Sequence, residues 1–317
     1  IVAWLLLAGS VIGGATVAMG FASYFSALFH TPIITIALVL LVIIEIILII
    51  GVQQTAKVTI LFTVIEIIGL VIVILVGLPS IGSINYLEMA KGLKGVLEAG
   101  VLIFFGYLGF EGITRLAEET KDPEKNIPKA ILYSMMITTI IYILVGISAV
   151  SVIPWQELST SQAPLALVAE RTFGQQSFLI LSVIALFSTF NTALMMLLTG
   201  SRLIYGIAEQ EAIPKMFSRV GKRFRTPWVA IITIVVAAML FLFLGDLKTI
   251  ANLTNFTIFS VFIMINASVI YFRYKKPIST GFKAPLHIGR FPVIPFLGIV
   301  TSIFMIANLT PDVLLYG

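Results

Sequence analysis

Cysteine is absent from the 317-residue sequence, and charged residues make up only 11% of it. The absence of cysteine excludes disulfides, cysteine–zinc sites and thiol catalysis. Soluble globular domains contain about 25% charged residues, so the low charge content excludes a soluble enzyme, a disordered chain and a nucleic-acid partner. Histidine is scarce too, because His30 and His287 stand far apart with no partner at metal-ligand spacing. Walker-loop, zinc and serine–histidine signatures are also missing, so we expect no metal site and no catalytic centre.

Hydrophobic residues, in contrast, make up 59% of the sequence, and the mean hydropathy is +1.09. This composition indicates an integral membrane protein embedded in a lipid bilayer. A helix needs roughly 20 apolar residues to cross the hydrocarbon core, and the apolar runs are too long and continuous for barrel strands. We therefore predict an all-α polytopic helix bundle of about nine spans. The predicted spans are 1–28, 33–50, 56–77, 96–119, 128–153, 178–209, 229–245, 250–272 and 291–309.

The basic residues predict the orientation of these spans. Sixteen of the 20 lysine and arginine residues fall in one alternating set of loops, and only Lys91, Lys94, Arg171 and Lys248 fall in the other. Cytoplasmic loops are enriched in lysine and arginine, so the first set is predicted to be cytoplasmic, together with residue 1. The net charge of +5 is therefore a topology signal.

Both ends of the sequence lie within apolar stretches. The chain opens without methionine at Ile1-Val2-Ala3-Trp4, with no secretory signal pattern, and stops at Leu314-Leu315-Tyr316-Gly317. We therefore expect the sequence to be part of a longer protein.

The clearest irregularity lies in the middle of the fourth predicted span, in the run Phe104-Phe105-Gly106-Tyr107-Leu108-Gly109-Phe110-Glu111-Gly112. Three glycines and a glutamate within seven residues predict an interrupted helix near 106–110. Such a break leaves carbonyls and amides that only protein, water or a ligand can satisfy inside a bilayer. The half-helix ending near Phe105 would suit an ammonium group or cation, and the one starting near Glu111 would favour the ionised carboxylate. The alternative is a glycine-lined packing seam between helices.

Two further polar features lie at membrane depth. Glu66 is at the centre of the third predicted span, where an ionisable residue is costly and should face the bundle, so it is a candidate proton carrier. Its alternative role is a protonated side chain that only bonds a neighbouring helix. Glu45 lies near the cytoplasmic end of its span and can reach the interface, which favours a structural role. Ser188-Thr189-Phe190-Asn191-Thr192 can bond other helices or line a cavity.

These residues carry a family signature. Gly106-Tyr107-Leu108-Gly109-Phe110-Glu111, followed by Glu118-Glu119-Thr120-Lys121-Asp122-Pro123-Glu124-Lys125-Asn126-Ile127-Pro128, resembles the sixth helix and following loop of transporters of the amino acid–polyamine–organocation (APC) superfamily. The later run Ser201-Arg202-Leu203-Ile204-Tyr205-Gly206 is similar to the end of that family's eighth helix. The resemblance covers essentially the whole chain, and the acidic loop with its Asn-Ile-Pro motif is the specific part.

The resemblance implies the leucine-transporter fold, with two inverted five-helix repeats of which the first is cut short. Residues 1–317 would form a single transmembrane transporter domain holding family helices three to eleven. Phe105 would be the aromatic lid over the substrate, and Ser188 and Asn191 would face the site from helix eight. The carbonyls of Phe105, Gly106 and Leu108 would receive the substrate amine. The implied substrate-binding residues are Phe105, Gly106, Tyr107, Leu108, Gly109, Glu111, Ser188 and Asn191.

One position departs from the family pattern. Several proton-coupled relatives carry a lysine on helix five that stands in for a sodium ion, and Glu66 occupies the matching position here. Our hypothesis is that Glu66 itself carries the coupling proton or pairs with a cation.

Together, the residues and the resemblance predict a secondary active transporter of amino acids in the cytoplasmic membrane. It would work by proton-coupled symport with alternating access and would need no cofactor beyond a proton or sodium ion. The alternatives are an amino acid or polyamine exchanger, a polytopic membrane enzyme, and a non-transporting fragment. The sequence leaves the identity of the amino acid and the oligomeric state open.

Overall fold

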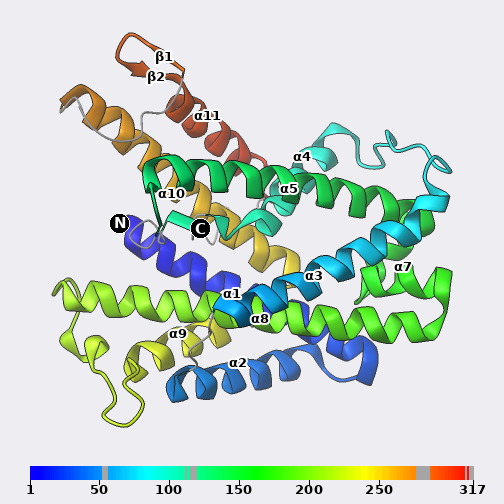
Figure 1. Cartoon of the computed structure of the whole chain (residues 1–317), viewed down its shortest axis with the longest axis horizontal. Coiled ribbons are helices and arrows are strands. Elements are labelled where there is room, and N and C mark those ends of the chain that lie inside the picture. Colours follow the sequence, from blue (N-terminus) through cyan, green and yellow to red (C-terminus); the bar gives the residue numbers. More distant parts are fainter. Residues whose placement is uncertain (52–55, 111–112, 115–119, 276–285, 311–312, 314–317) are drawn as a thin grey trace. The chain divides into compact units, whose positions relative to one another are not determined.

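The computed structural model describes the chain except residues 52–55, 111–112, 115–119, 276–285, 311–312 and 314–317, and it is almost entirely helical in the part described (Figure 1). Among the residues described, six helices are long and apolar enough to cross a membrane. They are α1 (Val2–Phe29), α2 (Ile33–Ile50), α3 (Ala56–Gly77), α5 (Pro123–Val152), α8 (Gln175–Glu209) and α10 (Leu247–Lys275).

The remaining elements are short. Two of them, α9 (Trp228–Phe241) and α11 (Val293–Ala307), are apolar. The others are α4 (Gly92–Ile103), α6 (Trp155–Thr160), α7 (Pro164–Phe173), the 3-10 helices η1 (Leu78–Ser80), η2 (Phe104–Tyr107) and η4 (Lys215–Ser218), and the strands β1 (His287–Ile288) and β2 (Phe291–Pro292).

Eight of the nine predicted spans correspond to these apolar helices. The fourth, 96–119, does not form one continuous helix, because α4 ends at Ile103 and continues as η2. Two short helices, α6 and α7, were not predicted from the sequence, and they occupy the segment between the fifth and sixth predicted spans. Both are too short to give a spanning hydropathy signal.

The chain divides into two compact units, each built from segments distant in sequence. Unit 1 comprises residues 1–9, 89–140 and 251–317, and unit 2 comprises residues 10–88 and 141–250. Unit 1 therefore contains α4, η2, the two strands, α11, most of α10 and the first part of α5, whose last part (141–152) belongs to unit 2. Unit 2 contains α2, α3, α6, α7, α8, α9 and most of α1.

Helix α3 shows why the helices of unit 2 associate as they do. One face carries exposed apolar side chains at helical spacing: Ile60, Val64, Ile68, Val71 and Leu75. The opposite face carries Val73 and Val76, which are 1% and 3% exposed. A helix that exposes one whole apolar face and buries the opposite face is suited to lipid on the first side and protein on the other.

The buried face of α3 packs in a core shared with α5, α7 and α8, which includes Val73, Ala149, Val168 and Leu181. A Cβ added at Gly77 would lie 2.3 Å from the Cβ of Ser148, so glycine permits the close approach of α3 and α5 there. The Ser148 hydroxyl donates to the Ile74 carbonyl at 3.3 Å. Close backbone approach through small residues, joined by a hydroxyl bond, is typical of helix packing in membranes.

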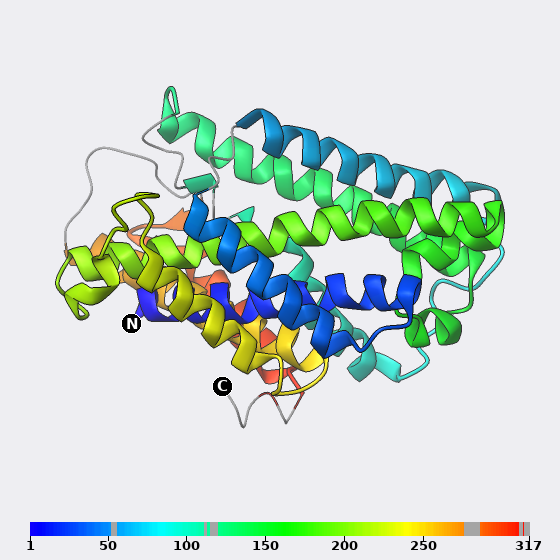
Figure 2. The same cartoon turned by 90° about the horizontal axis from the view of Figure 1, so that it is seen from below.

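Helices α2 and α9 form a second pair within unit 2 and lie side by side in both cartoon views (Figures 1 and 2). Leu41 and Ile44 of α2 and Ile231 and Ile234 of α9 are at most 1% exposed. The end of α2 is held by the Thr226 hydroxyl, which donates to the Ile49 carbonyl at 2.7 Å. The last carbonyls of a helix need such outside donors.

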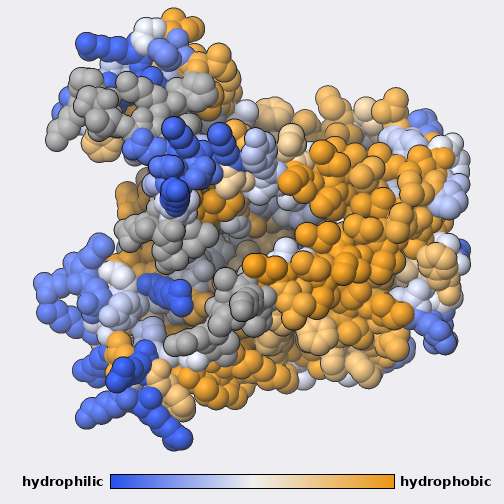
Figure 3. All heavy atoms as spheres, viewed as in Figure 1, coloured by the Kyte–Doolittle hydropathy of each residue, from blue (hydrophilic) through white to orange (hydrophobic). Residues whose placement is uncertain are grey.

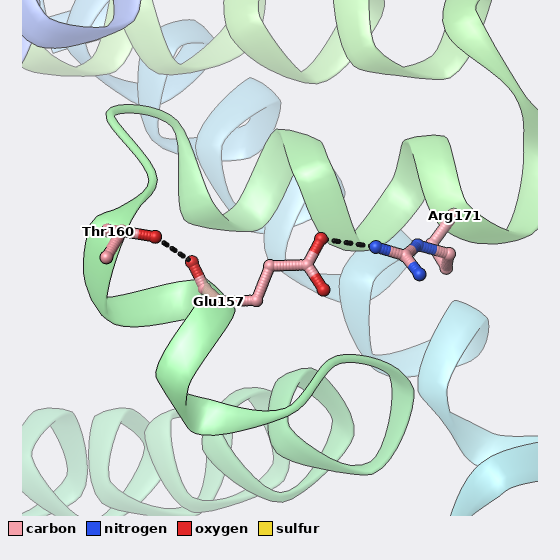
Figure 4. A network of polar contacts seen from close by, with 3 residues as sticks. All are labelled: Glu157, Thr160 and Arg171. Carbon is pink, nitrogen blue, oxygen red and sulfur yellow. Dashed lines mark hydrogen bonds and ion pairs between the residues drawn. The ribbon is translucent and has the colours of Figure 1, made fainter.

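The α6–α7 connection is closed by an exposed ion pair. Arg171 of α7 donates to the carboxylate of Glu157 in α6, and the Thr160 hydroxyl donates to the Glu157 backbone carbonyl at 3.0 Å (Figure 4). The two charged side chains are 52% and 41% exposed. Exposed pairs contribute at most about 1 kcal/mol, so we read this contact as structural.

Hydrophilic side chains gather at helix ends on the face drawn in Figure 3, whereas apolar side chains cover the helix lengths of unit 2. The segment 210–227 after α8 is an example, since Lys215, Arg219, Lys222, Arg223 and Arg225 are all exposed there. Basic side chains at the ends of apolar helices suit the membrane interface.

Asp246 caps the start of α10 and gives a testable pH dependence. Its carboxylate accepts the Thr249 backbone N–H at 2.9 Å, and hydrogen bonds from Thr249 lower the pKa of Asp246. Because the folded-state pKa is depressed, the stabilisation is present above the unfolded value of about 3.9 and is lost as pH falls through the folded value.

We therefore expect Asp246→Ala to cost about 1 kcal/mol at neutral pH, measured as a lower Tm of the purified protein. This difference should shrink as the pH falls below about 4. Asp246→Asn keeps a capping acceptor, so its Tm should fall less than that of Asp246→Ala. An equal Tm for Asp246→Ala and the unaltered protein at pH 7 would contradict this interpretation.

Candidate functional site

The interrupted helix predicted near 106–110 appears as a change of backbone geometry at the end of α4. The α-helix ends at Ile103, and Phe104–Tyr107 form the 3-10 turn η2. Leu108 is extended, with φ −62° and ψ 140°, and Gly109 has φ +120°. Only glycine adopts that φ without strain. The regular hydrogen-bond ladder of α4 therefore stops within an apolar stretch.

The carboxyl end of α4 carries the partial negative charge of a helix end. The last carbonyls of a helix point away from its end and carry partial negative charge, which favours a cation or an ammonium group. The Phe105 carbonyl accepts the Leu108 backbone N–H at 3.2 Å. One of the three carbonyls implied to receive the amine is thus already used in the turn, and only its second lone pair is left for a ligand.

The side chains of the interrupted segment differ in exposure. Phe105, Tyr107 and Leu108 are half-buried, whereas Gly106 and Gly109 are exposed. The space beside Gly109 is open, with no atom within 4 Å of an added Cβ. The backbone conformation at position 109 therefore requires glycine, whereas crowding by neighbouring atoms does not. Glu111, the carboxylate predicted to belong to this site, lies outside the described residues.

Helix α10 holds this segment within unit 1. The Asn255 side-chain amide donates to the Val101 carbonyl at 2.7 Å. The ring of Phe104 lies 4.7 Å from that of Phe259 and 6.1 Å from that of Phe262, centroid to centroid. Residues 255, 259 and 262 are spaced by four and three, so they share one face of α10. That face is turned towards the end of α4.

Glu66 lies on the side of α3 that packs against α8 in unit 2. Phe62 stacks on Phe187 of α8, with centroids 6.3 Å apart. A Cβ added at Gly69 would lie 2.8 Å from Ile184 of α8. Because 62, 66 and 69 share one helical face, Glu66 falls between these two contacts. Its side chain is half-buried, opposite the exposed apolar face of α3.

Ser188 and Asn191 lie on the same face of α8 as Ile184 and Phe187, at spacings of three, four and seven residues. Both are half-buried. The Ser188 carbonyl accepts the Thr192 hydroxyl at 2.9 Å. The structure therefore places the polar residues of α8 and the carboxyl of α3 on helix faces that pack together.

The predicted site residues thus fall into two groups. Phe105 to Gly109 belong to unit 1, and Glu66, Ser188 and Asn191 belong to unit 2. The first group lies in one continuous segment, and the second lies on helix faces that pack together. A single site formed by both groups stays a prediction.

The sequence analysis missed Asn252 and Asn255 of α10, which are 2% and 0% exposed. Their Oδ1 atoms are buried and, within the described residues, have no hydrogen-bond partner. The available signal was a pair of asparagines three residues apart in an apolar span. Polar residues inside such a span are costly and need a partner.

The apolar helices and the end of α4 define a multi-pass α-helical membrane protein in which one helix ends within an apolar stretch. Residues 1–313 match the model of the amino acid permease family. The chain belongs to this family, part of the APC superfamily, and the predicted resemblance is confirmed. The family comprises transporters rather than enzymes, which removes the polytopic-enzyme alternative, and it implies the leucine-transporter type of fold.

Several named relatives are similar to the chain. The branched-chain amino acid permease BcaP of Bacillus subtilis is 32% identical over 222 residues, which cover 70% of this chain and 47% of the relative. The methylthioribose transporter of B. subtilis is 27% identical over 327 residues, covering 94% and 68%. Cationic amino acid transporter 1 of Arabidopsis thaliana is 25% identical over 310 residues, covering 92% and 51%. The chain thus spans about half to two thirds of the length of these relatives.

Proposed function

We propose that this protein is a secondary active transporter of amino acids in the cytoplasmic membrane, working by alternating access within one transmembrane domain, residues 1–317. The observation that carries the proposal is the backbone break from Ile103 to Gly109 in a member of the amino acid permease family. Broken helices in transporters use their free dipoles to hold substrate and ions. The end of α4 would receive the ammonium group of the substrate.

The substrate class follows from this chemistry and from the relatives. Every amino acid carries the ammonium group that a helix carboxyl end favours. The break by itself therefore favours amino acids as a class and does not distinguish among their side chains. The names of the relatives refer to branched-chain amino acids, cationic amino acids and methylthioribose. Phe105 would cover the bound substrate, and Ser188 and Asn191 would contribute polar groups from α8.

Proton-coupled symport is the mode of transport that Glu66 supports. A carboxyl on the protein-facing side of α3, at the middle of a span, can take up and release a proton. Inside a membrane, ionisable residues of this kind mark proton pathways in pumps and transporters. The second candidate is an exchanger, in which a counter-substrate replaces the proton.

Uptake into proteoliposomes by the full-length protein tests the proposal. The panel comprises labelled amino acids and methylthioribose, each with and without an inward proton gradient. We expect at least one amino acid to accumulate, more strongly with the gradient. Competition of leucine against arginine would separate a neutral from a cationic preference. Uptake that requires an internal amino acid and ignores the gradient would favour the exchanger, and no uptake of any amino acid would refute the proposal.

A further inference from the structure

The contact between α10 and the interrupted segment links a buried polar side chain to the end of a helix. Asn255 is 0% exposed, and its Nδ2 group donates to the Val101 carbonyl at 2.7 Å. Val101 is itself 1% exposed and lies in the last turn of α4. Because the carbonyls of that turn lack a full set of intrahelical donors, Asn255 supplies a donor where the helix ends.

The orientation of the Asn255 amide follows from this contact. A carbonyl can only accept a hydrogen bond, so the nitrogen must face Val101 and the oxygen must face away. The Oδ1 atom has no partner among the described residues. Burying an acceptor without a partner is costly, and an apolar residue of the same size would avoid that cost. The single bond to Val101 is therefore what distinguishes asparagine from leucine at this position.

Aromatic contacts extend this attachment beyond α4 into η2. Phe104, the first residue of η2, contacts Phe259 and Phe262 of α10, and the ring of Phe110 lies 6.0 Å from that of Phe262. The attachments on α10 thus lie before and after the stretch 105–109. Within that stretch, the Leu108 backbone N–H donates to the Phe105 carbonyl at 3.2 Å.

We propose that Asn255 is a positioning residue that fixes the end of α4, so that residues 105–109 hold the orientation needed to bind substrate. The proposal rests on the transport function proposed above. Asn255 acts through the Val101 carbonyl and has no assigned contact with substrate. Helix α10 then moves with the interrupted segment, because the two are joined by a hydrogen bond and by ring contacts.

Hydrogen–deuterium exchange of the purified full-length protein tests the attachment without any substrate. Asn255→Leu keeps the size of the side chain and removes the donor. We expect the amides of residues 104–108 to exchange about tenfold faster, as for the loss of one hydrogen bond in a buried site. Unchanged exchange in this segment would overturn the proposal.

Two companion variants control the exchange experiment. Asn266 lies on the same helix, but its amide donates to the Phe262 carbonyl of its own helix at 2.9 Å. In the Asn266→Leu variant, the exchange rates of the amides of residues 104–108 should therefore stay within about twofold of those in the unaltered protein. Should Asn255→Leu not fold, Asn255→Thr serves instead. Its introduced hydroxyl would bond the carbonyl one turn back in α10, as the Thr257 hydroxyl does, and would leave Val101 without a donor.

Uptake kinetics then test the link to transport. Asn255→Leu should raise the KM for the transported amino acid about five- to tenfold, because one lost hydrogen bond weakens the binding geometry, while Vmax falls less than twofold. Faster exchange with an unchanged KM would overturn the positioning role. Absence of transport by the unaltered protein would refute the proposed function, and the exchange result would still decide whether Asn255 holds the segment.

Discussion

Replacing Gly109 by alanine is expected to lower the initial rate of substrate uptake more than tenfold in proteoliposomes. Gly109 has φ +120°, where the Cβ of an L residue clashes with its own backbone, and such strain costs about 1–3 kcal/mol. The added methyl would meet no other atom within 4 Å. The penalty therefore comes from the backbone alone, and the chain relieves it by changing the path of residues 105–109.

Gly100→Ala is the matched control for this prediction. Gly100 lies nine residues earlier in α4, also has no atom within 4 Å of an added Cβ, and has no positive φ. Alanine there should keep uptake within about twofold and favour the helix by up to about 1 kcal/mol. Equal uptake by the two variants would show that the break at Gly109 has no part in transport. Size-exclusion profiles of both variants separate loss of folding from loss of transport.

Replacing Glu66 by glutamine is expected to abolish the stimulation of uptake by an inward proton gradient. A symporter that moves one proton with each substrate gains about tenfold in accumulation ratio per pH unit of gradient, since one unit is worth 1.36 kcal/mol. Glutamine keeps the shape of the side chain and cannot carry the proton. Exchange or facilitated uptake of the substrate should persist, because the end of α4 is unaltered. The measurement is the accumulation ratio at imposed gradients of zero, one and two pH units.

Glu45→Gln provides the control for charge removal. Glu45 is a second glutamate within an apolar helix of unit 2, is half-buried like Glu66, and lies five residues before the end of α2. Its variant should keep the tenfold gain per pH unit of the unaltered protein. If Glu66→Gln accumulates substrate as strongly as Glu45→Gln, the coupling proton is carried elsewhere.

The membrane-spanning helices could be predicted from the sequence because their signal is local. The second and third predicted spans, 33–50 and 56–77, have the same bounds as α2 and α3. An apolar run of this length has no alternative to a helix in a bilayer. The helix break was also locally encoded, since Gly106 and Gly109 interrupt an apolar run.

The role of α10 could not be predicted in the same way. Asn255 and Val101 are 154 positions apart, and nothing in either local sequence pairs them. Asn255 differs from Asn266 of the same helix only through its neighbours, since one amide donates to another helix and the other to its own. The short helices α6 and α7 escaped prediction because neither is long enough to give a spanning hydropathy signal.

The sequence by itself determined that this chain is a helical membrane protein of the amino acid permease type, with an interrupted helix near 106–110. Hydropathy, glycine spacing and the loop motif act over neighbouring residues and need no folded context. Tertiary structure alone decided which neighbour each inward-facing polar side chain meets, and so placed Glu66 on the side of α3 that packs against α8 and Asn255 against the end of α4. The physical reason is that a polar residue in an apolar helix indicates which face is turned inward but does not identify the distant segment that packs there.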